Sequence, residues 1–168
     1  IQDALRMVEG AYALLFLTET QLIAAQDRRA FHPLSLGKLN DGWVVASETC
    51  ALDVCGAEFV REIEPGEMLV IDAEGLHSQK FMEQSLRSIC SFEYIYFARP
   101  DSEIDGISVH NARKEMGRQI CREVPTEADV VIGVPDSGLV AAIGFAEESG
   151  LPYEMGMMKN RYVGRTFI

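Results

Sequence analysis

The residues best suited to chemistry lie in the stretch DVVIGVPDSG (129–138). It is a short β-branched apolar run that breaks at Gly133 and ends in Asp-Ser-Gly (136–138). The apolar residues of the following stretch, 139–149, recur at helical spacing. The pattern therefore predicts a buried strand, a tight turn and a helix that opens on Asp-Ser.

A helix that begins in this way has two possible roles. Its first turn carries unpaired N–H groups and a favourable dipole, which together suit a phosphate or carboxylate. The hydroxyl of Ser137 can then contact the anion or a metal ion. Alternatively the turn is only a capped helix start, with Asp136 or Ser137 as the N-cap. The pattern alone leaves both readings open.

The elements around this turn alternate between helix and strand. Residues 109–124 are predicted to form a helix closed by Pro125, with Ala112, Met116, Ile120 and Cys121 on its apolar side. A strand at 129–134, a helix at 139–149 and a short strand at 153–158 follow. This order indicates a parallel α/β sheet. The aromatic segment FEYIYFA (92–98) is predicted to be a strand that packs Phe92, Tyr94 and Tyr96 on one face.

The first half of the chain has a different pattern. It contains short apolar runs separated by turn signals, such as Asn-Asp-Gly (40–42) and Pro-Gly (65–66). We expect antiparallel strands within 10–25, 32–39, 43–47, 59–64, 67–72 and 76–81, with a short helix or turn at 48–54. The composition changes near residues 82–92, where two architectures are expected to meet.

Composition limits the classes of function. The formal net charge of −11 over 168 residues argues against a nucleic-acid surface. No run is long enough for a membrane span, and no secretory signal is visible. The four cysteines form no CxxC pair, which suits free thiols in a reducing cytoplasm. The chain lacks an initiator Met and stops without a terminating signal, so we expect a fragment of a longer protein.

Three segments, ICSFEYIYFARPDS (89–102), GVPDSG (133–138) and KNRYVGRTFI (159–168), together resemble the glutamine phosphoribosylpyrophosphate amidotransferase family. Upstream, EGAYALL (9–15) and VVASETCALD (44–53) extend the resemblance over essentially the whole chain. It implies an α+β and α/β protein. Residues 1–82 would be the C-terminal part of an N-terminal-nucleophile glutaminase sandwich, and residues 83–168 the start of a type I phosphoribosyltransferase parallel sheet.

The resemblance also implies an activity for the full-length enzyme. Ammonia released from glutamine would displace pyrophosphate from phosphoribosyl pyrophosphate, giving phosphoribosylamine, glutamate and pyrophosphate in the first step of purine synthesis. Purine nucleotides would inhibit, and the full-length enzyme would be a homo-oligomer. The nucleophilic cysteine and the ribose-phosphate loop would lie outside residues 1–168, so this fragment is expected to hold no catalytic residue and to be inactive alone.

Several residues of this chain match substrate-binding positions of the family. Ser137 would help to hold magnesium and pyrophosphate, within a loop that includes Asp136 and Gly138. The residues that would contact phosphates or belong to the loop that closes over the substrate are Lys159, Arg161, Tyr162, Arg165 and Thr166. Cys90 coincides with the first ligand of an iron–sulfur cluster in the members that carry one; otherwise it is a small buried hydrophobe.

One segment departs from the family. DRRAFHPL (27–34) stands where the family has Asp-Pro-Asn-Gly-Phe/Ile-Arg-Pro-Leu, so Ala30 replaces a glycine and His32 replaces an arginine. This puts the local turn, and its support of the glutamine pocket, in doubt. Two alternatives follow: a non-catalytic homologue that binds nucleotide or a partner protein, or a salvage-type phosphoribosyltransferase related only through its second half.

Overall fold

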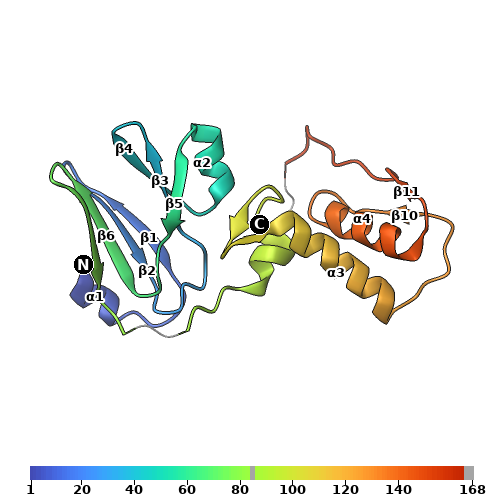
Figure 1. The fold of residues 1–168 in the computed structure, drawn as a ribbon, viewed down its shortest axis with the longest axis horizontal. Coiled ribbons are helices and arrows are strands. Elements are labelled where there is room, and N and C mark those ends of the chain that lie inside the picture. The colour runs from blue at the N-terminus through green and yellow to red at the C-terminus, as the bar shows by residue number, and fades with distance from the viewer. Residues whose placement is uncertain (84–85, 165–168) are drawn as a thin grey trace.

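The computed structural model describes residues 1–83 and 86–164. Figure 1 shows an elongated molecule, with antiparallel strands gathered at one end and two long helices at the other. A short helix, α1 (Gln2–Arg6), precedes the strands. The chain is therefore a mixed α and β protein that combines antiparallel sheets, helices and a small parallel sheet.

The first sheet has four antiparallel strands in the order β1-β2-β6-β7. They are β1 (Ala13–Leu17), β2 (Leu22–Gln26), β6 (Glu67–Asp72) and β7 (Gly75–Lys80). The predicted hairpin within 10–25 is confirmed, because β1 pairs with β2 in antiparallel register. Central strand β2 is buried on both faces: Ala24 and Ala25 have no exposed surface.

The second sheet has the order β4-β3-β5. Its strands are β3 (Ser35–Leu39), β4 (Gly42–Ala46) and β5 (Glu58–Glu62), and the helix α2 (Thr49–Cys55) links β4 to β5. The Asn-Asp-Gly turn and the helix predicted at 48–54 are both confirmed. A core between the two sheets contains Ala24, Leu34, Leu36, Ile63 and Leu69.

The segment 92–98 is not a strand, which corrects the prediction. Residues Glu93–Phe97 form a π-helix, η1, in which Ala98 N–H donates to Glu93 O at 3.0 Å. The predicted packing of the aromatic rings is wrong for Phe92 and Tyr96, which are more than half exposed, whereas Tyr94 packs against the buried residues Ala98, Ile104 and Val109. A continuous apolar run of this length does not distinguish a strand from a helix by periodicity. The buried guanidinium of Arg113 decides the conformation, because it binds two carbonyls of this segment.

A small hairpin, β8 (Glu103–Ile104) with β9 (Ile107–Ser108), leads into helix α3 (Val109–Glu123). The predicted helix is confirmed, and the Ser108 side chain caps it by accepting Asn111 N–H. Its buried side differs from the expectation: Ile120 is 52% exposed. The residues buried along α3 are Val109, Arg113, Gly117 and Cys121.

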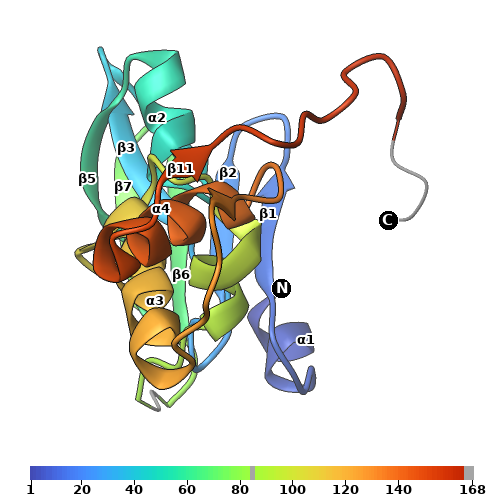
Figure 2. The same cartoon turned by 90° about the vertical axis from the view of Figure 1, so that its right-hand side faces the viewer.

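The last elements are β10 (Val131–Ile132), α4 (Gly138–Ser149) and β11 (Tyr153–Glu154). The predicted parallel pairing is confirmed, because β10 and β11 pair parallel with Val131 opposite Tyr153. Both strands are shorter than predicted, and the expected burial of the first is wrong, because Ile132 is 41% and Val134 61% exposed. Figure 2 shows α3 and α4 side by side, and glycines at their contact allow a close approach.

Candidate functional site

The loop between β10 and α4 places the Asp-Ser-Gly turn at the start of a helix, as predicted. Gly133 is needed where the loop passes α4, because a Cβ there would lie 2.9 Å from the Cα of Leu139. The loop closes with Gly138 N–H donating to Val134 O at 3.0 Å. The peptide bond between Pro135 and Asp136 is cis. The hydrogen bond between Gly138 and Val134 thus joins the start of α4 to the loop that follows β10.

Ser137 occupies the N-cap position of α4, but its side chain does not cap the helix. Its hydroxyl instead donates to the backbone carbonyl of Tyr96, at the end of η1, over 3.4 Å. This bond is long for an O–H···O contact and is easily exchanged for a better partner. The reading of Ser137 as a plain side-chain cap is therefore wrong, and its oxygen lone pairs are not used by the helix.

A cavity of about 1230 Å³ opens beside this turn. One wall is Pro135, Asp136 and Leu139, and the other is the segment 155–164, which includes Lys159 and Arg161. Lys159 Nζ lies 3.2 Å from an Asp136 carboxylate oxygen, and both side chains are more than half exposed. The cavity thus combines two cations and a carboxylate with apolar walls from Met155, Met157, Met158, Tyr162 and Val163.

The structure brings together only part of the predicted set. Asp136, Lys159, Arg161 and Tyr162 line this cavity, whereas Ser137 lines a neighbouring one of about 390 Å³ that it shares with Arg113 and Ile95. Arg165 and Thr166 lie outside the described residues. The contact between Asp136 and Lys159 was not predicted, because nothing in a sequence marks a pairing across 23 positions.

The donor atoms at the turn suit one of the two predicted metals. A hydroxyl and a carboxylate are oxygen donors, and magnesium commonly combines few protein ligands with substrate phosphates. The iron–sulfur cluster stays a prediction, because the resemblance places its other ligands beyond residue 168. Among residues 1–83 and 86–164 no group of three His, Cys, Asp or Glu side chains could hold a metal by itself. Cys90 is a free, partly buried thiol whose backbone N–H donates to Phe31 O.

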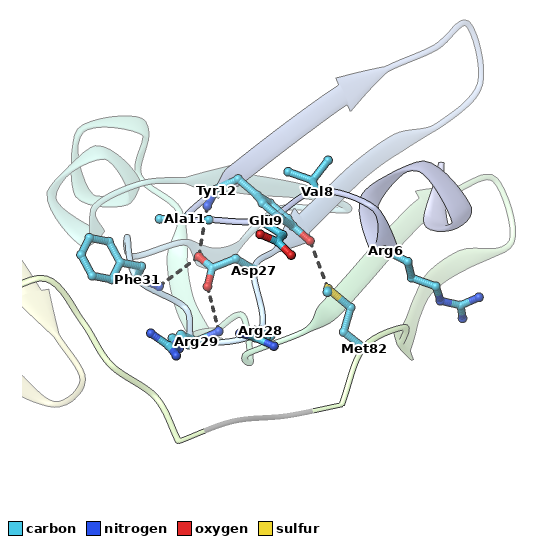
Figure 3. Close-up of a pocket in the computed structure, with 11 residues that line it drawn as sticks. Arg6, Val8, Glu9, Ala11, Tyr12, Asp27, Arg28, Arg29, Phe31 and Met82 are labelled. Carbon is cyan, nitrogen blue, oxygen red and sulfur yellow. Dashed lines mark hydrogen bonds between the residues drawn. The ribbon is translucent and has the colours of Figure 1, made fainter.

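A second cavity, of about 560 Å³, lies at the start of β1 and the end of β2 (Figure 3). Its central group is the buried carboxylate of Asp27, which accepts hydrogen bonds from the backbone N–H groups of Tyr12, Arg29 and Phe31. Burial, and secondarily the Asp27 charge, raise the pKa of Tyr12. Its hydroxyl contacts the Met82 sulfur at 3.2 Å. Asp27 therefore organises the altered 27–34 segment.

The two departures from the family pattern in that segment are accommodated. Ala30 takes a left-handed backbone conformation with φ of 48°, where a glycine would be free of strain. His32 Nδ1 lies 2.7 Å from a carboxylate oxygen of Glu93, at the start of η1. The turn is thus formed without the glycine, and His32 supplies a polar contact to Glu93. Sequence reasoning missed the pairing of His32 with Glu93, since 61 residues separate them.

The chain is closely similar to known amidophosphoribosyltransferases over its whole length. The enzyme of Bacillus subtilis (strain 168) is 60% identical over 168 residues, which are 100% of this chain and 35% of the relative. That of Mycobacterium tuberculosis (strain H37Rv) is 59% identical over 99% of this chain and 31% of its own length, and that of Archaeoglobus fulgidus 53% identical over 95% and 35%. No protein-family model matches the chain.

Solved structures agree with these relatives. A structure described as the allosteric regulatory enzyme of purine biosynthesis superimposes with a TM-score of 0.93 at 59% identity, over 99% of this chain and 36% of that one. The B. subtilis glutamine phosphoribosylpyrophosphate amidotransferase complexed with ADP and GMP gives the same TM-score and identity, over 99% and 37%. The chain thus spans about a third of the length of the relatives it matches.

Among the described residues, no helix has the length and apolar character needed to cross a membrane.

The resemblance found in the three sequence segments is confirmed by the relatives and the solved structures, whose similarity extends over the antiparallel sheets as well as the α/β part.

Proposed function

This chain matches amidophosphoribosyltransferases from end to end, and we propose that it serves the same reaction as part of such an enzyme. The similarity at 60% identity over all 168 residues is the observation that carries the proposal. The whole protein would release ammonia from glutamine and transfer it to phosphoribosyl pyrophosphate. The ammonia nitrogen would form a bond to the ribose C1 while the bond from C1 to the pyrophosphate oxygen breaks.

We assign the two parts of the chain to the two halves of this reaction. The antiparallel sandwich, within residues 1–82, would belong to the glutaminase, and the α/β part, within residues 83–168, to the phosphoribosyltransferase. The change from antiparallel to parallel pairing between β7 and β10 supports this division. By their similarity to the relatives, we also propose a cytoplasmic, homo-oligomeric enzyme that purine nucleotides inhibit.

The loop 133–138 and the segment 155–164 would form the pyrophosphate side of the substrate pocket. Lys159 and Arg161 supply positive charge beside the N-terminus of α4, an arrangement that suits a polyanion. Magnesium, when bound with pyrophosphate, would neutralise the charge that builds up on the leaving group. The Ser137 hydroxyl would be its ligand from this chain. An iron–sulfur cluster at Cys90 stays a prediction that rests on the resemblance, and no step depends on it.

Lys159 would change partner when substrate arrives. In the structure its ammonium is paired with Asp136, and both residues line the cavity. A phosphate group carries more charge than one carboxylate and would draw the ammonium into the pocket. Because the pair is exposed, its contribution is at most about 1 kcal/mol, so the exchange costs little.

The two alternatives have less support. A salvage-type phosphoribosyltransferase does not account for the matched sandwich, which makes up half of the chain. A non-catalytic homologue was suggested by the altered segment 27–34, and the structure forms that turn through Asp27.

A segment exchange tests the proposal. The matching third of the B. subtilis enzyme is replaced by residues 1–168, and phosphoribosylamine formation is measured with glutamine and phosphoribosyl pyrophosphate. We expect activity within about tenfold of the parent enzyme, since the exchanged segments are 60% identical and most substitutions away from a site change little. A chimera that folds and assembles like the parent but makes no phosphoribosylamine would contradict the proposal.

A further inference from the structure

Glu48 lies in the sandwich, yet its side chain is used by the α/β part. A single carboxylate oxygen, Oε2, accepts two hydrogen bonds, one from the backbone N–H of Arg99 and one from the Ser102 hydroxyl, each at 2.7 Å. Ser102 is only 2% exposed. Glu48 is also the N-cap residue of α2, but its side chain makes no capping bond there. The same oxygen also contacts the Cys50 thiol of α2 at 3.6 Å. The carboxylate thus joins α2 to the turn 99–102 of the other half of the molecule.

Two other side chains of the sandwich also accept hydrogen bonds from the backbone of residues 103–105. The Thr49 hydroxyl oxygen accepts Glu103 N–H at 2.8 Å, and a Glu62 carboxylate oxygen accepts Asp105 N–H at 2.5 Å. The other oxygen of Glu62 binds the guanidinium of Arg87. The turn 99–102 and the hairpin that follows thus donate their backbone N–H groups to side chains of α2 and β5, beside which they lie (Figure 1).

The turn held by Glu48 is also the end of the π-helix η1. The guanidinium of Arg113 binds Ala98 O at 2.7 Å and Tyr94 O at 2.5 Å, which fixes η1 on α3. A third carbonyl of this segment, that of Tyr96, accepts the Ser137 hydroxyl at 3.4 Å. Two steps of direct contact, through the turn and through η1, therefore connect Glu48 to the loop at the start of α4.

We propose that Glu48 is a positioning residue that docks the 99–102 turn on the sandwich and, through η1, orients the Ser137 hydroxyl. While the Ser137 hydroxyl donates its proton to the Tyr96 carbonyl, its lone pairs are directed away from η1. The contact is long, so it biases the orientation of the hydroxyl and does not lock it. A contact between Ser137 and pyrophosphate rests on the function proposed above. The docking of the 99–102 turn by Glu48 does not depend on that function.

The carboxylate is suited to this task because one of its oxygens accepts from both donors of the turn, Arg99 N–H and the Ser102 hydroxyl, as well as from the Cys50 thiol. Hydrogen bonds to a charged acceptor are shorter and stronger than those between neutral groups. Removing the acceptor leaves a nearly buried hydroxyl and a backbone N–H without partners, which is more costly than the loss of an exposed ion pair. Glutamine keeps one acceptor oxygen in the same place without the charge.

Two probes separate the halves of the molecule in a urea titration. Trp43 is the only tryptophan and lies in β4, so its fluorescence reports on the sandwich. Far-UV circular dichroism is dominated by α3 and α4, which hold most of the helical residues. In the unmodified chain we expect the two transitions to coincide. In Glu48→Ala we expect the helix signal to be lost at a lower urea concentration than the Trp43 signal.

Hydrogen exchange tests the connection to the loop. In Glu48→Ala we expect the amides of Ala98 and Gly138 to exchange at least about tenfold faster, since each gains an easier local opening. Glu48→Gln should restore most of the protection. Glu19→Ala is the matched control, because Glu19 is an exposed glutamate of the sandwich in the turn between β1 and β2.

Coincident transitions together with unchanged exchange at Ala98 and Gly138 in Glu48→Ala would overturn the proposal. If that variant does not fold, Ser102→Ala removes one of the two donors and is judged by the same two results. A Ser137→Ala variant that uses phosphoribosyl pyrophosphate as well as the parent would instead count against the proposed function. The hydrogen exchange of Ala98 and Gly138 would still decide the role of Glu48.

Discussion

Gly117 of α3 and Gly144 of α4 lie at the contact between the two helices. Replacing either by alanine tests that contact, because helix propensity alone would raise the stability of the protein and overpacking would lower it. A Cβ added to Gly117 would lie 1.9 Å from Ala141 O, and one added to Gly144 would lie 1.9 Å from Lys114 O. The two clashes are reciprocal, since each is with the backbone of the other helix. Neither neighbour can rotate away, because a backbone carbonyl is fixed by its helix.

The expected cost of Gly117→Ala follows from this geometry. Relief of the contact requires the helices to separate by more than about 1 Å, which weakens dispersion along the whole interface. Overpacking of this kind costs about 1–3 kcal/mol. Alanine gains about 1 kcal/mol in helix propensity over glycine at an interior position. The overpacking is set by a rigid backbone and lies at the upper end, so we expect a net loss of about 2 kcal/mol.

Urea denaturation followed by far-UV circular dichroism measures this change. Asn111→Ala, at an exposed position of α3, is the control that raises propensity without a clash. We expect Gly117→Ala and Gly144→Ala each to lower the midpoint, and the double variant to lose less than the two single losses combined, because one separation relieves both contacts. If Gly117→Ala is as stable as the parent or more stable, the close packing of α3 on α4 is wrong.

Two further predictions concern buried and exposed charge. Burial alone would raise the pKa of Glu67, but hydrogen bonds from Arg61, Ser78 and Glu64 N–H outweigh it and lower that pKa. Glu67→Gln should therefore cost about 2–3 kcal/mol, since it leaves donors unmatched in the sandwich; a midpoint equal to that of the parent in a Trp43-detected urea titration would refute this. Hydrogen bonds from Arg and Lys lower the folded-state pKa of three glutamates on α3 and α4, Glu115, Glu147 and Glu148. These ion pairs therefore stabilise the folded protein fully above the ordinary glutamate pKa of about 4.3. The stabilisation is lost as the pH falls through the lower folded-state pKa values. The urea midpoint of the far-UV circular dichroism signal should fall between pH 5 and pH 3, and added salt should change that midpoint less at the lower pH. An equal effect of salt on the midpoint at both pH values would count against these ion pairs.

Most of the antiparallel part could be predicted from local signals. Asn40 takes a positive φ of 51° in the Asn-Asp-Gly turn, so the turn chemistry sets the β3–β4 register. The strands are short, alternate with turn residues and were placed within a few positions. The same holds for α3 and α4, whose helical spacing is long enough to be distinctive.

The parts that could not be predicted depend on distant contacts. The conformation of η1 is decided by Arg113, a residue whose place in a helix suggests a solvated side chain rather than a buried one. The exposure of Ile120 depends on the axis along which α4 packs, which the two glycines set. The link from Glu48 to Ser102 spans 54 positions and carries no local signal.

At the candidate site, the turn and its helix followed from the pattern, whereas its assignment to pyrophosphate required the resemblance. The loop alone is equally compatible with a plain helix start. What the structure adds is that Ser137 does not cap α4 and that Lys159 reaches Asp136. The lone pairs of the Ser137 hydroxyl are therefore not used by the helix, whereas Lys159 would have to leave Asp136 to meet a polyanion.

We propose that the loop 133–138 and the segment 155–164 form the pyrophosphate side of a phosphoribosyl pyrophosphate pocket. The most direct test uses the chimeric enzyme with ammonia in place of glutamine, which bypasses the glutaminase. We expect Ser137→Ala and Lys159→Gln each to lower kcat/KM for phosphoribosyl pyrophosphate by at least about tenfold, through lost charge-assisted contacts. Ser149→Ala, at the other end of α4, should change it by less than about twofold. Unchanged kcat/KM in both site variants would contradict the account.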